Sequence, residues 1–144
     1  MEIVLDFNVV FSALYGGRVS REVFTLNHII REVTFLVPAY FWEEFEGKKE
    51  KLLKITKLTE NELNFVLRVI KSQTVEIPPE IFSGKLGEAE KLSPDPKDVP
   101  YVALAMALEI PLLTGDLKLR EKIEGKLKVY SPSELLVVLK GGLL

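Results

Sequence analysis

The sequence predicts an α/β fold of three layers, in which helices cover both faces of a mostly parallel, twisted sheet of about five strands. Short runs rich in apolar and β-branched residues alternate with helical segments along the 144 residues, and this alternation is typical of consecutive parallel βα units. The runs that predict strands are EIVLD (2–6), VTFLVP (33–38), TVEIP (74–78), IPLLTG (110–115) and KLKVYS (126–131). A chain of this length suffices for one sizeable core, so we expect a single domain over 1–144.

The first predicted strand stops on an acidic residue. Positions 3–5 form a continuous apolar run, as in a strand buried on both faces, whereas the apolar positions of 9–14 recur at helical spacing. Asp6 therefore lies where a strand gives way to a helix, which in an open parallel sheet is the edge where ligands bind. A carboxylate there either caps the helix or belongs to a site, and Asn8 has the same two interpretations.

Several later elements have recognisable boundaries. The pairs Thr59 with Glu62 and Ser131 with Glu134 predict capping boxes at two helix starts, and we expect Gly141 to end the last helix. Residues 98–108 predict an Ala-rich helix that packs closely on the sheet, with a proline tolerated in its first turn. The Pro- and Gly-rich segment 78–98 predicts an irregular excursion.

Two groups of apolar residues admit different interpretations. Phe41, Trp42 and Phe45 indicate core packing more strongly than a platform for stacking bases. Val23, Phe24 and Ile30 belong either to the core or to the interface of a homo-oligomer, since one sequence does not separate the two.

Composition excludes several functional classes. Lysine and arginine number 19 against 21 acidic residues, a net charge of −2, so any nucleic-acid contact must use a local basic patch. The candidates for phosphate contact are Lys48, Lys49, Lys118 and Arg120, although such residues also form ordinary solvated helix faces. Cysteine is absent, which rules out disulfides and thiolate chemistry. With no signal peptide or membrane-length apolar run, we expect a cytoplasmic protein without membrane contact.

Two further acids join Asp6 to suggest a metal site. Asp116 follows the fourth predicted strand and Asp98 begins the Ala-rich helix, so both are expected near the same sheet edge. Clustered carboxylates require a cation, and oxygen ligands in a chain with one histidine favour Mg²⁺ or Mn²⁺. Asp6, Asp98 and Asp116 are therefore the predicted metal ligands, with phosphodiester hydrolysis the matching chemistry. Asp116 is alternatively a turn residue and Asp98 a helix cap.

Two stretches carry a resemblance to a known family. VLDFNVVFSAL (4–14) and DPKDVPYVALAMALEIPLLTGDLKL (95–119) resemble the PIN-domain nucleases, which include the VapC-like toxin ribonucleases. The resemblance implies a Mg²⁺-dependent endoribonuclease acting on single-stranded or structured RNA. It also implies a small antitoxin partner and a homo-oligomer. Its catalytic residues fall on Asp6, Glu44, Asp98 and Asp116, with Asn8 and Thr114 in supporting roles.

The resemblance favours Glu44 over Glu46 as the catalytic glutamate. The helical pattern alone does not separate the two, because Glu46 lies as close to the apolar stripe of the helix. Phe7 and Lys118 depart from the family pattern, because many relatives have a small polar residue and an acid there. These departures motivate one alternative, a catalytically silent PIN-like scaffold that binds RNA or protein. Another alternative is a HAD-type phosphohydrolase with Asp6 as nucleophile, although Asn8 stands where that mechanism needs an acid.

Overall fold

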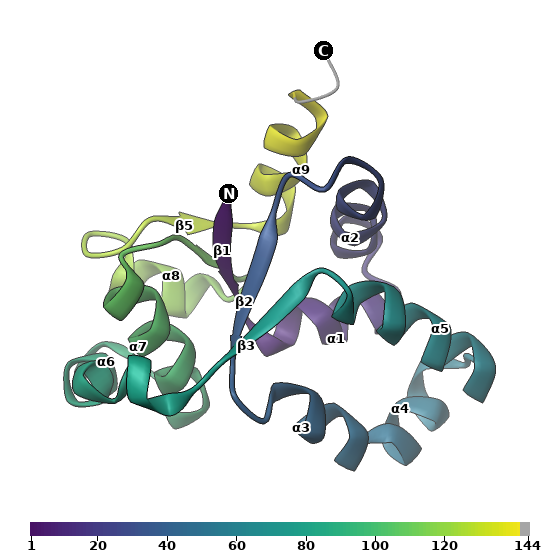
Figure 1. The fold of residues 1–144 in the computed structure, drawn as a ribbon, viewed down its shortest axis with the longest axis horizontal. Coiled ribbons are helices and arrows are strands. Elements are labelled where there is room, and N and C mark those ends of the chain that lie inside the picture. The colour runs from purple at the N-terminus through teal and green to yellow at the C-terminus, as the bar shows by residue number, and fades with distance from the viewer. Residues whose placement is uncertain (142–144) are drawn as a thin grey trace.

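The centre of the protein is a five-stranded parallel sheet with strand order β3-β2-β1-β4-β5 (Figure 1). This computed structural model describes residues 1–141. The strands are β1 (Glu2–Leu5), β2 (Thr34–Pro38), β3 (Thr74–Ile77), β4 (Leu112–Leu113) and β5 (Val129–Tyr130). The parallel sheet expected from the sequence is confirmed, and each strand lies inside one of the runs that predict strands.

Helices cover both faces of the sheet, as expected. On one face lie α1 (Phe7–Tyr15), α2 (Arg18–Ile30), α5 (Glu60–Lys71) and α9 (Pro132–Gly141), which contact one another, and on the other lie α6 (Leu86–Leu92) and α7 (Val99–Leu108) (Figure 1). The remaining helices are α3 (Phe41–Gly47), α4 (Lys49–Thr56) and α8 (Leu117–Ile123), with three 3₁₀ turns, Pro79–Ile81, Ser83–Lys85 and Pro96–Asp98. None of the helices in the described part of the chain combines the length and apolarity needed to cross a membrane.

The strand order creates a crevice at one edge of the sheet. The chain moves outward from β1 through β2 to β3, then returns across the sheet through α7 to β4 on the other side of β1. The connections that leave β1 and β4 therefore diverge to opposite sides, and the carboxyl ends of such strands are where open α/β folds bind ligands.

The helix boundaries largely follow the predicted signals. Thr59 and Glu62 form a complete capping box at α5, and Ser131 and Glu134 exchange the two equivalent hydrogen bonds at α9, of 3.0 and 3.1 Å. Helix α9 includes Gly141, the last residue that the structure describes.

The prediction of an irregular segment over 78–98 is wrong, because it contains α6 as well as the 3₁₀ turns. Proline and glycine dominated the composition of this segment, yet Leu86, Ala89 and Leu92 recur every three residues. Ala89 is fully buried, and α6 packs with this side against α7. An apolar stripe only one helix turn wide was sufficient because α7 supplies the surface that the short helix needs.

Both groups of apolar residues that had two interpretations in the sequence contribute to the core. Phe41, Trp42 and Phe45 are buried, as expected. Val23 and Phe24 are also buried, with 0% and 2% of their surface exposed, so their apolar character serves this chain's own core and not a face for another copy. Ile30 lies half-buried at the end of α2 and packs against the same core.

A buried polar network joins α2 to the sheet. The Asn27 side chain donates to the Val33 carbonyl at 2.9 Å and to Gln73 Oε1 at 2.8 Å, and it accepts from the Val33 N–H at 2.9 Å. Gln73 in turn donates to the Phe24 carbonyl at 2.9 Å. Every polar atom of the Asn27 amide is thereby paired, which fixes the start of β2 and of β3 against α2.

We predict that Asn27→Ala lowers the free energy of unfolding by about 3 kcal/mol, because it leaves two backbone groups of Val33 and one Gln73 oxygen without buried partners. Asn61→Ala, at an exposed position of α5, should change the same quantity by less than about 0.5 kcal/mol. Urea unfolding monitored by circular dichroism measures both variants. Equal effects of the two substitutions would show that the network does not stabilise the fold.

Candidate active site

The four predicted acids line one cleft at the carboxyl edge of the sheet. Its volume is about 140 Å³, and its walls are Asp6, Phe7, Asn8, Glu44, Lys48, Asp95, Lys97, Asp98, Tyr101 and Asp116. Asp6 follows β1, Glu44 lies on α3, Asp98 precedes α7 and Asp116 precedes α8. Four segments distant in sequence therefore place carboxylates around one small space.

The Thr114 hydroxyl connects two of these acids. It donates to Asp6 Oδ2 at 2.7 Å and accepts from the Asp116 N–H at 3.1 Å. Asp6 occupies the N-cap position of α1 without a capping hydrogen bond of normal geometry from its side chain. Burial raises the pKa of Asp6, while the hydrogen bond from Thr114 and the N–H groups of Asn8 and Phe7 oppose that shift and the nearby charge of Asp116 adds to it.

Asp116 does two things at once. Its Oδ1 accepts from the N–H groups of Lys118 and Leu119 at 3.0 and 3.2 Å and so caps α8. The side chain also lines the cleft beside Asp6 and Asp98. Asp116 is therefore both a residue of the turn before α8 and a residue of the cleft. The capping hydrogen bonds fix the orientation of its carboxylate.

Asp98 is buried, with 6% of its surface exposed, and its side chain makes no capping hydrogen bond to α7. The capping role falls to Asp95, whose Oδ1 accepts from the Lys97 N–H at 2.9 Å in the preceding turn. Burial, followed by the charges of Asp6, Asp116 and Asp95, raises the pKa of Asp98 to about 6. Without a cation, ionisation of this carboxyl group therefore costs more free energy in the folded protein than in the unfolded chain.

Aromatic packing positions Glu44. The ring of Phe7, the first residue of α1, stacks on Phe45 at a centroid distance of 4.3 Å and meets Phe41 edge-on at 5.8 Å. This packing holds α3 against the start of α1, with Glu44 on the side of α3 that faces the cleft. Glu46 does not line the cleft.

Two lysines share the cleft with five carboxylates. Lys48 pairs with Glu44 at 3.6 Å, and its ammonium lies 4.6 Å from the centre of the Phe7 ring. Lys97 makes no ion pair within residues 1–141. Lys97 and Tyr101 were missed in the sequence, although they stand one residue before and three residues after Asp98, where a turn followed by a helix brings side chains together.

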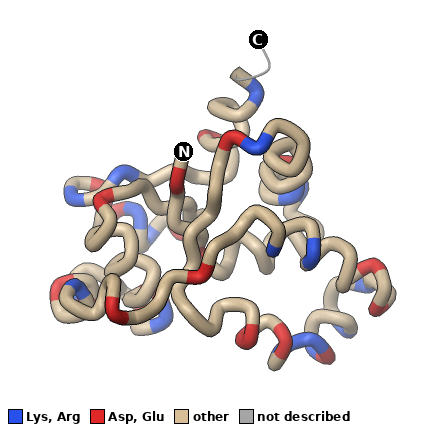
Figure 2. The backbone as a smooth tube through the Cα atoms, in the orientation of Figure 1, with Lys and Arg blue, Asp and Glu red and all other residues tan. Residues whose placement is uncertain are grey.

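The other basic candidates lie elsewhere. Lys49 pairs with Glu60 at 3.4 Å, and Lys118 is exposed and outside the cleft. Arg120 forms ion pairs with Glu124 and Glu134, which tie α8 to the start of α9. Figure 2 shows both signs of charge interspersed along the chain. Among these candidates only Lys48 lines the cleft.

The donor chemistry of the cleft suits a hard divalent cation. Within residues 1–141 the Asp98 carboxylate accepts no hydrogen bond, and Oδ2 of Asp116 is likewise free of protein donors. None of the three aspartates forms an ion pair in that part of the chain. In the same residues no three acidic or histidine side chains stand close enough to form a ready-made metal cage. Binding an ion would therefore require these side chains to draw closer.

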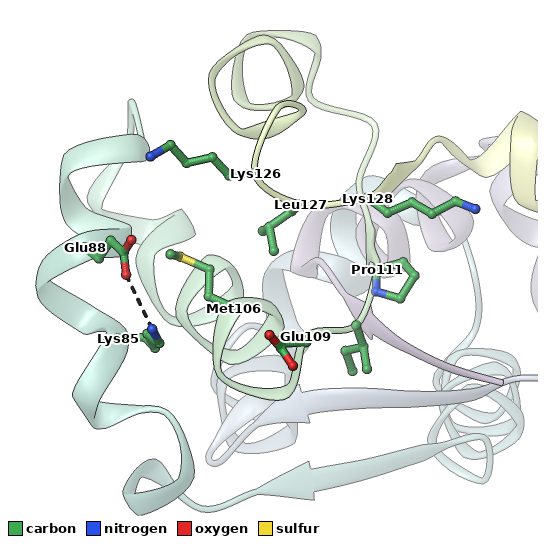
Figure 3. A pocket seen from close by; sticks show the side chains of 9 residues that line it. Lys85, Glu88, Met106, Glu109, Pro111, Lys126, Leu127 and Lys128 are labelled. Carbon is green, nitrogen blue, oxygen red and sulfur yellow. Dashed lines mark ion pairs between the residues drawn. The ribbon is translucent and has the colours of Figure 1, made fainter.

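A larger hollow of about 400 Å³ lies at the opposite edge of the sheet, where β4 and β5 begin (Figure 3). Its lysines are Lys85, Lys126 and Lys128, and Lys85 pairs with Glu88 at 3.6 Å. It contains none of the predicted site residues. The acidic cleft is therefore the better candidate for the active site.

Comparisons with known proteins agree with this architecture. The structure of VapBC2 from Rickettsia felis bound to a DNA fragment from their promoter is similar over 91% of this chain and 98% of that chain, with a TM-score of 0.59 and 17% identity. No curated protein sequence matches the chain. A family model described as PIN domain matches residues 4–125. The match spans most of the chain and includes all four acids, Asp6, Glu44, Asp98 and Asp116. The chain therefore belongs to the PIN-domain family.

Proposed function

We propose that this protein is an endoribonuclease that hydrolyses phosphodiester bonds of single-stranded or structured RNA with Mg²⁺ or Mn²⁺. The observation that carries the proposal is the convergence of Asp6, Asp98 and Asp116 in one cleft, where no cation from residues 1–141 forms an ion pair with any of them. PIN domains are generally nucleases and typically use a divalent metal, which agrees with this donor set.

Asp6, Asp98 and Asp116 would hold the metal. When bound, the metal supplies charge that stabilises the phosphate in the transition state and lowers the pKa of a water ligand. Thr114 orients Asp6, and the two backbone N–H groups at the start of α8 orient Asp116. Such outer hydrogen bonds commonly determine how well carboxylates bind an ion.

Glu44 is the candidate for orienting or deprotonating the attacking water. It lines the cleft from α3, opposite the aspartates that follow the sheet strands, and it is exposed enough to exchange protons with solvent. Attack of this water on phosphorus, with the 3′-oxygen leaving, yields a 5′-phosphate and a 3′-hydroxyl. Lys48 neutralises Glu44 in the absence of substrate and is placed to contact a phosphate.

The alternative of a silent scaffold rested on Phe7 and Lys118, and neither residue obstructs the cleft. The Phe7 ring packs on α3 and helps to place Glu44, while Lys118 lies outside. The alternative of a HAD-type phosphohydrolase receives no support from the match to the PIN domain over residues 4–125.

A small antitoxin partner, assembly with further copies of the chain and action in the cytoplasm are parts of the same proposal. The fold shared with VapBC2 supports it. Exposed apolar residues such as Ile29 on α2 and Val137 on α9, with 77% and 71% of their surface exposed, offer candidate contacts.

Glu44→Gln is expected to reduce kcat for RNA cleavage by about 10²- to 10⁴-fold, because it removes the group that activates water. Glu46→Gln, two residues away and outside the cleft, should retain the rate of the native protein. Gel assays with single-stranded RNA in Mg²⁺ and in chelator measure both. Equal rates for the two variants, or full activity in chelator, would refute the mechanism.

In chelator at neutral pH, Asp6→Asn should melt at a higher temperature than the native protein, because it removes a buried charge whose pKa is raised. Saturating Mg²⁺ should stabilise the native protein by about 2.7 kcal/mol at a hundredfold excess over the dissociation constant, and stabilise Asp6→Asn much less. Thermal melts with and without Mg²⁺ test this. An equal shift of both proteins would mean that Asp6 is not a ligand.

The raised pKa of Asp98 predicts a specific pH dependence in chelator. Burial and the other acids hold it at about 6 in the folded protein against 3.8 when unperturbed. The folded state therefore binds this proton more tightly, and ionisation costs stability progressively from about pH 4 to about pH 6 and fully above it. Relative to Asp98→Asn, the native protein should lose stability across that range in urea unfolding. A difference that stays constant with pH would contradict the shift.

A further inference from the structure

A second groove opens beside the acidic cleft. It has a volume of about 640 Å³ and extends between the end of β2, the 3₁₀ turn Pro79–Ile81 and the first turn of α7. Glu44, Lys97 and Tyr101 line both the groove and the cleft. Anything bound across this shared wall occupies the candidate active site and the groove together.

The groove is lined mainly by aromatic side chains and prolines. Phe41, Phe82 and Tyr101 are buried beneath it, and Pro38, Pro79 and Pro100 complete its apolar surface. The volume is within the range of about 300 to 1,000 Å³ that holds small organic ligands. These walls suit a flat apolar group.

Tyr40 lines the groove with an exposed ring. Its backbone has φ 70° and ψ 5°, the left-handed region, which a bulky residue rarely adopts. The Tyr40 N–H donates to Glu76 Oε2 at 3.1 Å, which holds this turn to β3. Of the Tyr40 surface, 66% faces water, next to a groove whose other aromatic rings are buried.

The charges distinguish what the groove binds from what the cleft binds. Glu43 and Glu44 line the groove and disfavour a phosphate inside it. Lys97, which makes no ion pair in the described residues, stands where groove and cleft meet and is placed to contact a phosphate there. Single-stranded nucleic acids are commonly bound by this combination of a basic residue for the backbone and an aromatic ring for a base.

We propose that the groove binds the unpaired base of a nucleotide next to the scissile phosphate, an inference that rests on the proposed ribonuclease function. Tyr40 stacks on this base and Lys97 contacts the adjoining phosphate. The substrate is then single-stranded at this nucleotide, since a paired base is not free to enter the groove. Tyr40 is a binding residue and takes no part in the chemical step.

The test compares matched tyrosines. Dissociation constants of fluorescein-labelled RNA hexamers are measured by anisotropy in Mg²⁺ on the slow-cleaving Glu44→Gln protein, and kcat/KM on the protein with native Glu44. Tyr40→Ala should weaken binding by about 5- to 150-fold, the usual effect of removing one stacking ring. Tyr40→Gly, which suits the left-handed backbone, should give the same loss, whereas Tyr40→Phe should not. Tyr15→Ala, at a tyrosine on α1 that is 62% exposed, is the control.

Hexamers with one abasic sugar identify the base. At one position the abasic sugar should reproduce the loss caused by Tyr40→Ala, and adding Tyr40→Ala should then have no further effect. Lys97→Ala should weaken binding of both kinds of hexamer, whereas Lys91→Ala, at an exposed position of α6 outside groove and cleft, should not. If the native protein cleaves RNA while Tyr40→Ala behaves like Tyr15→Ala, the base-binding groove is refuted and the ribonuclease function stands. If the native protein neither binds nor cleaves RNA, the proposed function fails as well.

Discussion

The Thr114 hydroxyl is the interaction on which the geometry of the cleft depends. It donates to Asp6 and accepts from the Asp116 backbone, so one oxygen fixes two acids that follow neighbouring strands. The sheet prepares this contact, since the Asp6 N–H bonds the Leu113 carbonyl at 3.1 Å and the Thr114 N–H bonds the Tyr130 carbonyl at 3.0 Å. Three strands thus set the position of a hydroxyl that in turn orients carboxylates of like charge.

Holding like charges together has a cost that the rest of the fold must offset. Desolvation raises the pKa of both Asp6 and Asp98, so each is less stable as an anion in the folded protein than in the unfolded chain. The apolar helix α7, packed on β1, β2 and β4, and the fully paired network around Asn27 supply rigidity away from the cleft. Sites that are strained for function are commonly supported by such surroundings.

The sequence predicted the structure well where a local pattern of residues marks a strand or the start of a helix. Strand ends gave the edge on which Asp6 and Asp116 lie, and capping residues gave the starts of α5 and α9. Helix α6 was not predicted because its apolar stripe is short and because proline and glycine are frequent in the surrounding sequence. The sequence analysis missed Tyr40, Lys97 and the groove for another reason. Exposure and ion pairing depend on which segments meet in space, as with Arg120, whose partner Glu124 follows α8 while its partner Glu134 lies in α9.

The sequence distance between the acids has a consequence during synthesis. Thr114 and Asp6 are 108 residues apart, and β4, which Thr114 follows, is inserted beside β1 only after β2 and β3 have been made. A ribosome-bound chain that ends before β4 has Asp6 and Asp98 but lacks Thr114 and Asp116, so its cleft is incomplete. Because domains acquire their long-range contacts only when the partner strands have emerged, the acids of the cleft come together only after β4 has left the ribosome. The order of the strands thus keeps the candidate active site unassembled until most of this domain has been synthesised.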